Sequence, residues 1–334
     1  MKFDSHDIEK EIFIVAEIGN NHEGNINVAK ELIKQASIAR VNAVKFQTFI
    51  PENYVTSSDI KRINMLKKFQ LTNKEIISLA DFARSLGLIF FSTPFDIESA
   101  IFLNKIQSIF KISSGDNNFT QLVNKIFEFK KPTIISTGLA DLKLLEKLYD
   151  NWFCKNPNLP ISFLHCVTSY PVLDTQANMN RINKLKLKFP KAIIGYSDHT
   201  IGLESACLAV SMGARIIEKH FTIDKNFSEF RDHQLSADPI ELKDLVERIR
   251  KIEIMMSNES NQGSKDEESN RIAVRRSIAA SRNINAKKVI NKDDLTWLRP
   301  GTGFKPGEEN CLIGRSTVKE IKKGEIILPE MLKG

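Results

Sequence analysis

The chain has 334 residues, and 42% of them are hydrophobic, so it can bury a large core and lacks the composition of a disordered protein. Its formal net charge is +7, but Lys and Arg alternate with Glu and Asp along most expected helices, which argues against a nucleic-acid partner. The longest apolar runs are too short to span a bilayer and the first residues lack a signal-peptide pattern, so we expect a cytoplasmic protein without a membrane partner.

Short β-type runs alternate with longer amphipathic segments from residue 12 to residue 256. Strand and helix are expected in turn at 12–16 and 25–39, 43–46 and 73–86, 88–91 and 97–106, 109–112 and 119–129, 133–135 and 142–152, 161–164 and 178–189, 192–194 and 202–212, and 216–217 and 239–256. Eight such pairs predict an α/β protein with a (β/α)8 TIM barrel. The alternative is an open doubly wound sheet, but the first run is not followed by a glycine-rich dinucleotide fingerprint.

The sequence turns polar after Met256, and the stretch Ser257–Ser269 is typical of a linker. Short β-type pieces at 277–280 and 317–320, with a turn-rich stretch at 299–307, then predict a small, mostly β module. Because roughly 60 residues make a marginal domain, we expect this module to dock on another surface. The expected parts are a barrel domain at 1–257, a linker at 258–273 and a second domain at 274–334.

Active sites of (β/α)8 barrels lie where the strands end. Two lysines at such ends, Lys45 and Lys111, are costly to place in a barrel mouth unless an anion meets them. Neighbouring hydroxyl groups are suited to phosphate, although either lysine singly could instead extend its ammonium to water. Every expected strand end is polar: Glu17, Lys45 and Gln47, Ser92 and Thr93, Lys111 with Ser113 and Ser114, Ser136 and Thr137, His165 and Thr168, Ser197 and His199, and Glu218 and His220.

The last two strand ends each carry a histidine. Side chains alternate along a strand, so Ser197 and His199 share one face of the first run, and Glu218 and His220 share one face of the second. Two imidazoles can therefore meet at the same end of adjacent strands. Either histidine alone would be an ordinary polar residue, but the pair, flanked by Asp198 and Glu218, favours a metal site.

An ordered set of motifs resembles the sialic acid synthase family, whose barrels condense phosphoenolpyruvate with a mannosamine-type sugar and precede an antifreeze-like (SAF) module. The resemblance spans nearly the whole chain. Its motifs are Ala16-Glu-Ile-Gly-Asn-Asn-His-Glu-Gly24, Val44-Lys-Phe-Gln-Thr48, Phe91-Ser-Thr-Pro-Phe95, Lys111-Ile-Ser-Ser-Gly115, Ser136-Thr-Gly138, His165-Cys166, Tyr170-Pro171, Ser197-Asp-His-Thr200, Glu218-Lys-His-Phe221 and Arg299-Pro-Gly301.

The resemblance implies a divalent metal, Mn²⁺ with Mg²⁺ or Co²⁺ as alternatives, held by His199 and His220. It also implies a domain-swapped homodimer, in which Arg299 reaches the acyl group of the sugar from the partner's C-terminal module. Phosphoenolpyruvate would be bound by Lys45, Thr93, Lys111, Ser114, Ser136, Tyr170 and Ser197. The sugar would be bound by Glu17, Gln47, Asp232 and Arg299, and the catalytic set would be Glu17, Glu218, His199 and His220.

Glu218 shares a strand face with His220, and we expect its carboxylate to handle the attacking water or a sugar proton. A salt bridge to Lys45 or Lys111 is an adequate structural alternative. The chain departs from the family pattern at three places near the sugar end. Thr168 stands where the pattern has Asn, Phe230-Arg-Asp232 replaces Gly-Pro-Asp, and Asp116 replaces Glu.

The expected reaction joins phosphoenolpyruvate to N-acetylmannosamine, or a close 2-acylamino hexose, with carbon–oxygen cleavage, and gives N-acetylneuraminate and phosphate. A 2,4-diacetamido-trideoxy hexose would instead give legionaminate or pseudaminate, and a 6-phosphosugar would give the 9-phosphate. A deoxy-sugar-acid synthase acting on a phosphorylated aldose would need further basic residues, for which Arg231 and Lys219 are candidates. A non-catalytic sugar-binding protein is a more remote alternative.

Overall fold

The computed structural model describes residues 2–3, 6–256 and 265–333. They form two compact units, Met1–Asn258 and Glu259–Gly334, each with its own hydrophobic core. Residues 258–264 of the expected linker lie outside the described part. The rest of that linker, 265–273, lies in a helix that was not predicted, α12 (Lys265–Val274).

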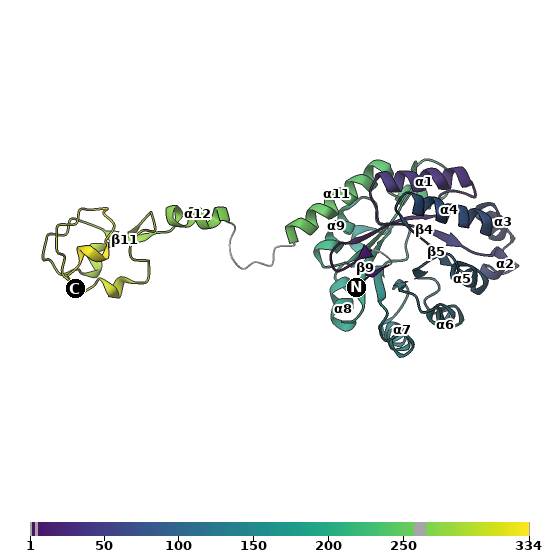
Figure 1. Ribbon diagram of the computed structural model, residues 1–334, viewed down its shortest axis with the longest axis horizontal. Helices are drawn as coiled ribbons and strands as arrows, with labels where there is room; N and C mark the ends of the chain where they lie inside the picture. Colours follow the sequence, from purple (N-terminus) through teal and green to yellow (C-terminus); the bar gives the residue numbers. More distant parts are fainter. Residues whose placement is uncertain (1, 4–5, 257–264, 334) are drawn as a thin grey trace. The chain divides into compact units, whose positions relative to one another are not determined.

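The first unit is a parallel eight-stranded sheet that curls into a nearly closed barrel, which confirms the predicted fold (Figure 1). At the seam between β5 and β6, the side-chain amide of Gln107 accepts from Ser92 N–H at 2.8 Å and donates to Ser92 C=O at 3.2 Å. The sheet order is β5-β4-β3-β10-β9-β8-β7-β6. The strands are β3 (Phe13–Gly19), β4 (Ala43–Thr48), β5 (Ile89–Pro94), β6 (Phe110–Ile112), β7 (Thr133–Ser136), β8 (Ile161–Cys166), β9 (Ile193–Asp198) and β10 (Ile216–His220).

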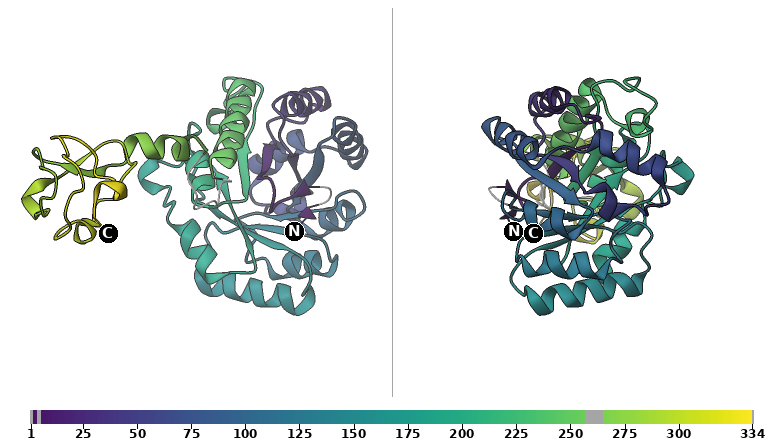
Figure 2. Two further views of the ribbon diagram at one scale, coloured as in Figure 1. Left: turned by 60° about the vertical axis from the view of Figure 1, so that its left-hand side comes forward. Right: turned by 90° about the vertical axis from the view of Figure 1, so that its right-hand side faces the viewer.

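Eight helices follow these strands and pack around them, as the two turned views in Figure 2 show. Local sequence sets their ends: Asn25 caps α1, and Thr72 forms a capping box with Glu75 on α4. Apolar residues at helical spacing, such as Leu32, Ile33 and Ala36 of α1, face the strands. The helices are α1 (Ile26–Ile38), α4 (Asn73–Ser85), α5 (Ile97–Leu103), α6 (Thr120–Glu128), α7 (Leu142–Lys155), α8 (Arg181–Lys188), α9 (Glu204–Ser211) and α11 (Pro239–Met256).

Three short helices in loops were not predicted from the sequence: α2 (Pro51–Tyr54), α3 (Ile60–Phe69) and α10 (Asp232–Leu235). The first two lie between β4 and α4, and the third lies between β10 and α11. All three therefore follow the carboxyl end of a strand, which is the end where barrels place their sites.

An unpredicted N-terminal hairpin, β1 (Lys2–Phe3) with β2 (His6–Asp7), closes the other end of the barrel. The Phe3 ring packs edge-on against Phe13, at the start of β3, with ring centres 5.6 Å apart. Phe3 and Ile8 join the cluster of apolar side chains inside the barrel. Because this end is filled, the polar carboxyl ends of the strands form the open end.

The second unit contains a two-stranded antiparallel sheet, β11 (Ser277–Ala280) with β12 (Leu295–Leu298), and confirms the predicted strand at 277–280. The predicted strand at 317–320 is wrong. Thr317 makes only an isolated bridge to Leu332, and its hydroxyl donates to the Asn285 carbonyl at 2.7 Å. Local side-chain bonds of this kind compete with a backbone ladder. Short 3₁₀ turns complete the described unit at Lys292–Asp294, Glu309–Cys311 and Pro329–Met331.

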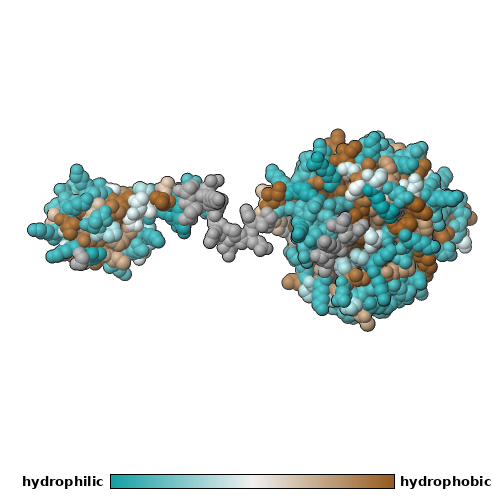
Figure 3. Space-filling view, viewed as in Figure 1, coloured by the Kyte–Doolittle hydropathy of each residue, from teal (hydrophilic) through white to brown (hydrophobic). Residues whose placement is uncertain are grey.

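The face of the barrel unit shown in Figure 3 is mainly hydrophilic, with scattered apolar side chains. This agrees with the interpretation of the mixed charges as solvated helix faces. Within the described parts of the chain, every helix is too short or too polar to cross a membrane.

Candidate active site

The strand register brings the predicted polar side chains together at the open end of the barrel. Glu17 of β3 lies beside Lys45 of β4 and beside His220 of β10, and Glu218 of β10 lies beside Ser197 of β9. The facing predicted from strand alternation is therefore confirmed. These residues line a cavity of about 1340 Å³, large enough for two small substrates.

Two lysines and two glutamates form a buried charge cluster at the base of this cavity. Lys45 Nζ lies 2.7 Å from Glu17 Oε2 and 3.7 Å from Glu218 Oε1. Lys111 Nζ donates to the same Glu218 oxygen at 3.1 Å, and Ser197 Oγ donates to it at 2.9 Å. Glu218 is therefore the shared partner of both ammonium groups.

The two carboxyl groups of this cluster ionise differently. Burial opposes the charge of Glu218, but Lys111, Lys45 and the Ser197 hydroxyl outweigh it and lower its pKa to about 2. Burial raises the pKa of Glu17, and the nearby Glu218 carboxylate adds to the rise, against the opposing effect of Lys45. A pair of acids whose pKa values are separated in this way is suited to different proton-transfer roles.

His199 and His220 meet above the charge cluster, with ring centres 5.2 Å apart. His199 Nδ1 lies 2.9 Å from the Val167 carbonyl, which fixes that nitrogen as a donor and leaves Nε2 as an acceptor or ligand. The Tyr170 ring stacks on His199 at 4.3 Å. Burial lowers the pKa of His220 well below its usual range, a proton on His199 would reinforce this and the charge of Lys45 does so, and the ring therefore stays neutral.

These two imidazoles fit a divalent cation as ligands. Among the described residues, the buried His220 Nδ1 has no hydrogen-bond partner. The described residues contain no cluster of three or more His, Cys, Asp or Glu side chains that could enclose an ion. A cation held by this pair would therefore keep coordination positions for water or substrate oxygens, as catalytic metal sites do.

Hydroxyl groups at three further strand ends line one wall of the cavity, which we call the hydroxyl wall: those of Ser114, Ser136 and Thr168. The Asn117 side chain donates to the carbonyls of Ser136 and Gly138, at 3.2 and 2.9 Å, and so holds the loop after β7. A Cβ at Gly138 would lie 2.3 Å from Thr168 Oγ1 and 2.6 Å from Ser114 Oγ. Glycine is therefore required there for the two hydroxyls to approach each other across the backbone.

The opposite side of the cavity carries the residues predicted to bind the sugar. Gln47 Nε2 donates to Glu17 Oε1 at 3.1 Å. Asp232 is buried, and burial raises the pKa of its carboxyl group. Arg231 places its guanidinium 4.6 Å from the centre of the Tyr170 ring, with its Nε 3.4 Å from Asp232 Oδ1. Phe230 and Arg231, the two residues that depart from the family pattern at this place, also line the cavity.

Sequence reasoning missed an apolar wall supplied by α2 and α3. Leu66 and Phe69 of α3 pack with Phe95 in one cluster, against which Phe230 is also packed. The available signal was the stretch between the predicted strand at 43–46 and the predicted helix at 73–86, which is too long for a simple connection. Cys166 and Glu23 also line the cavity.

Lys219 and Asp198 do not line the cavity. Lys219 Nζ is buried against Asp198 Oδ2 at 2.9 Å and the Thr200 carbonyl at 2.6 Å, because alternation turns it away from Glu218 and His220. Lys219 is therefore not a basic residue of the cavity, and Asp198 is not beside the histidine pair. Arg299 is exposed on the second unit, and its role stays a prediction. The cavity does gather the other predicted residues: Glu17, Lys45, Gln47, Thr93, Lys111, Ser114, Ser136, Tyr170, Ser197, His199, Glu218, His220 and Asp232.

Fold and site together define a (β/α)8 barrel whose open end holds two buried lysines and an imidazole pair. Residues 32–261 match the model of the NeuB family, and residues 275–333 match that of the SAF domain. The chain therefore belongs to the NeuB family.

Named relatives agree with this assignment over almost the whole chain. The N,N'-diacetyllegionaminic acid synthase of Campylobacter jejuni is 36% identical, over 95% of this chain and 99% of that protein. The pseudaminic acid synthase of the same species is 31% identical, over 98% of each chain. A crystal structure of the N-acetylneuraminic acid synthetase from Leptospira borgpetersenii superposes with a TM-score of 0.73 at 34% identity, covering 78% of this chain and 90% of that one.

Proposed function

We propose that the protein condenses phosphoenolpyruvate with N-acetylmannosamine, or a close 2-acylamino hexose, and releases phosphate by carbon–oxygen cleavage. The observation that carries the proposal is the Lys45–Glu218–Lys111 cluster, buried directly beneath the His199–His220 pair. Two buried ammonium groups suit a substrate that carries both a phosphate and a carboxylate. The family relatives named above support the sugar as second substrate.

The side chains of the hydroxyl wall complete the phosphoenolpyruvate subsite. Lys45 and Lys111 would neutralise its two anionic groups, and Ser114 and Ser136 would donate hydrogen bonds to its oxygens. Ser197 would join them only by turning its hydroxyl from Glu218 to the ligand. Ser136 Oγ is buried and has no hydrogen-bond partner among the described residues, so a donor is available for a ligand. Thr93 is already close to Lys45 Nζ, at 3.2 Å, and would orient that ammonium.

His199 and His220 would hold a divalent cation, for which Mn²⁺ is our first choice, and that cation would polarise the aldehyde of the open-chain sugar. Glu218, ionised at neutral pH, would take the proton of the water that adds at carbon two. Glu17, with its raised pKa, would bind a sugar hydroxyl and exchange a proton with it. Carbon three of phosphoenolpyruvate would meanwhile bond to carbon one of the sugar.

A 2,4-diacetamido-trideoxy hexose is the second candidate acceptor. The apolar wall of Leu66, Phe69, Phe95 and Phe230 favours it, because a methyl group at carbon six loses no hydrogen bond against such a surface. The 36% identical legionaminic acid synthase points the same way. A 6-phosphosugar would have to reach Arg62, Lys68 or Arg231, which are exposed at the edge of the cavity.

The C-terminal module would complete the site in a homodimer, with Arg299 of one subunit serving the barrel of the other. Arginine keeps its charge and can donate to an amide carbonyl, which suits an N-acyl group. The exposed position of Arg299 on the second unit is compatible with this role.

The proposed function is tested by following phosphate release from phosphoenolpyruvate in the presence of Mn²⁺ and one acceptor at a time. The acceptors are N-acetylmannosamine, its 6-phosphate and 2,4-diacetamido-2,4,6-trideoxymannose. We expect acceptor-dependent release with one of the three, at least tenfold faster than with the others. Phosphate release that none of these acylamino sugars accelerates would contradict the proposal.

A further inference from the structure

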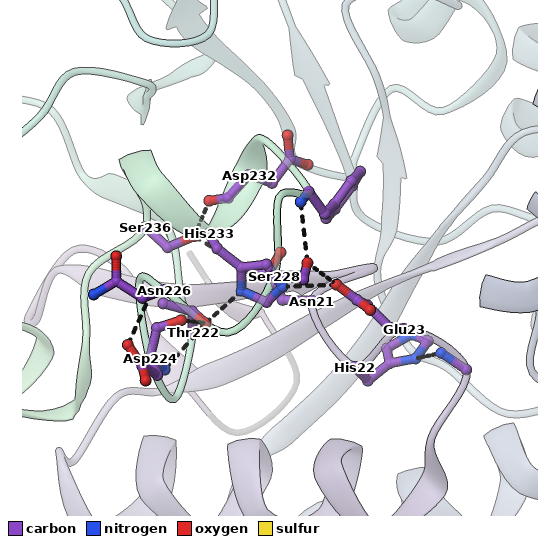
Figure 4. A network of polar contacts seen from close by, with 12 residues as sticks. Asn21, His22, Glu23, Thr222, Asp224, Asn226, Ser228, Asp232, His233 and Ser236 are labelled. Atoms are coloured by element: carbon purple, nitrogen blue, oxygen red, sulfur yellow. Dashed lines mark hydrogen bonds and ion pairs between the residues drawn. The ribbon is translucent and has the colours of Figure 1, made fainter. Parts of the chain in front are cut away.

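A histidine that the proposed chemistry does not use, His233, lies fully buried beside the cavity. Its Nδ1 is 2.6 Å from Thr222 Oγ1, and its Nε2 is 3.2 Å from Glu23 Oε1. Thr222 follows the end of β10, whereas Glu23 belongs to the loop between β3 and α1. One imidazole ring therefore links two loops that are far apart in the sequence but adjacent at the barrel mouth (Figure 4).

The hydrogen-bond directions make this link specific. A carboxylate can only accept, so His233 Nε2 must carry its proton and donate to Glu23. Ser228 Oγ also donates to Glu23 Oε1, and Ser228 in turn accepts from the Phe230 N–H at 3.0 Å. Glu23 thus gathers donors from Ser228, in the loop that leads from β10 to α10, and from His233, in α10 itself.

A second chain of bonds runs parallel to the first. Asn21 Nδ2 donates to the Phe221 carbonyl at 2.9 Å and to Ser236 Oγ at 3.0 Å. Ser236 Oγ donates to the Asp232 carbonyl at 2.5 Å. The backbone on both sides of His233 is therefore fixed to the first loop, and Figure 4 shows Asn21, Asp232 and Ser236 close to His233.

This network ends at the surface of the cavity. Asp232, the neighbour of His233 in the chain, lines the cavity, and so does Glu23. In Figure 4 the Asp232 carboxylate points away from the network, while its backbone carbonyl faces Ser236. A small shift of the backbone at residue 233 would therefore move the Asp232 carboxylate directly.

We propose that His233 is a positioning residue for the acceptor sugar, which it serves by holding Asp232 and Glu23 at fixed places on the cavity wall. The proposal rests on the proposed function, since it assumes that the sugar binds at this wall. The role is confined to the sugar, because the network does not reach the phosphoenolpyruvate subsite. Among the described contacts, no bond joins it to Lys45, Lys111 or the hydroxyl wall.

The test compares two substitutions of His233 in the full-length protein, once phosphate release by the wild type has been established. His233→Leu removes both hydrogen bonds at similar volume, and His233→Gln can still donate to Glu23. We expect His233→Leu to raise the acceptor KM about tenfold to hundredfold and to leave the phosphoenolpyruvate KM within twofold. His233→Gln should recover most of that loss.

Val246→Ala is the matched control, because Val246 is buried on α11 and lines no part of the cavity. It should lower the thermal midpoint without changing either KM.

Thr222→Val removes a hydroxyl at constant volume and gives a second test if His233→Leu does not fold; it should raise the acceptor KM selectively. Unchanged acceptor KM in a folded variant, or equal rises in both KM values, would overturn the positioning role. Absence of wild-type phosphate release would instead contradict the proposed function.

Discussion

Lys111 reaches across the barrel from β6 to contact Glu218 on β10, with Nζ and Oε1 3.1 Å apart. The same carboxylate oxygen lies 3.7 Å from Lys45 Nζ, so Glu218 is shared by two cations at the base of the cavity, and Glu17 lies 2.7 Å from Lys45 on its other side. Buried charges are tolerated when paired in this way. A dianionic substrate would offer the two lysines further partners in the place where chemistry is proposed.

Removing the charge of either lysine should weaken the binding of phosphoenolpyruvate more than the binding of the sugar. Lys45→Met and Lys111→Met keep much of the stem volume, and each should raise the phosphoenolpyruvate KM about tenfold to hundredfold, since a charged hydrogen bond is lost. Lys131→Met is the control: its ammonium binds the Asn104 and Gln107 carbonyls and does not line the cavity. A collapse of thermal stability with a normal KM in the remaining folded enzyme would assign the lysines a purely structural role.

Glu218→Gln should lower kcat by about a hundredfold or more, because it removes the group proposed to accept a proton from water. The neutral amide also leaves two buried ammonium groups without their shared counterion, so the thermal midpoint should fall. Phosphoenolpyruvate should therefore raise the thermal midpoint of the variant by more than it raises that of the wild type. Wild-type kcat in a destabilised variant would show that Glu218 serves only as a salt-bridge partner.

Metal removal should abolish phosphate release, and added Mn²⁺ should restore it. His199→Ala and His220→Ala should each lose activity and also bind Mn²⁺ more weakly in a titration followed by calorimetry. His6→Asn, in the N-terminal hairpin, is the matched control and should bind the ion normally. Full activity of metal-stripped His199→Ala would remove the basis for a metal at this pair.

Asp294 should make the second unit sensitive to acid. Burial opposes its charge, but the Asn291 N–H, Arg282 and Lys288 lower its pKa below the usual range. A carboxyl group whose pKa is lower in the folded than in the unfolded protein stabilises the fold at pH values above its unfolded pKa of about 3.9. This contribution is lost as pH falls through the folded pKa. The stability difference between wild type and Asp294→Asn should therefore shrink below about pH 4.

Urea unfolding followed by Trp297 fluorescence, in a Trp152→Phe background, measures this difference, because the chain has two tryptophans. Asp293→Asn is the control, since Asp293 is exposed beside the buried Asp294. A difference between wild type and Asp294→Asn that stays constant from pH 6 to pH 2 would show that Asp294 is not held in its charged form.

The proposed contribution of Arg299 to the partner's site is tested by mixing inactive subunits. Arg299→Ala should raise the KM of the sugar and spare that of phosphoenolpyruvate. Heterodimers of Arg299→Ala with His199→Ala would contain one site in which both residues are intact, and should recover activity. If subunit exchange is shown and activity does not return, each chain completes its own barrel.

The barrel and most of the site could be predicted from the sequence because both depend on local patterns. Alternation placed Ser197 and His199, and Glu218 and His220, on the correct faces, and the eight strand ends converged as a barrel requires. The same alternation, applied to Lys219, would have predicted that its side chain points away from the cavity. The structure shows it there, paired with Asp198.

Features that depend on contacts between distant segments escaped prediction. His233 and Glu23 are separated by 210 residues, and nothing in either local sequence indicates the other as its partner. Phe3 gains its role in closing the barrel only when the strands already surround it. The helix Lys265–Val274 was not indicated because a polar composition suits an irregular linker and a solvated helix equally well.

The most direct test of the central claim is the fate of the bridging oxygen of phosphoenolpyruvate. The protein is supplied with Mn²⁺, the preferred acylamino hexose and phosphoenolpyruvate labelled with ¹⁸O between carbon two and phosphorus, and the products are analysed by mass spectrometry. Carbon–oxygen cleavage after water addition predicts that the label leaves with phosphate and that the sugar product has gained three carbons. Label retained in the organic product, or phosphate formed without a new carbon–carbon bond, would contradict the account.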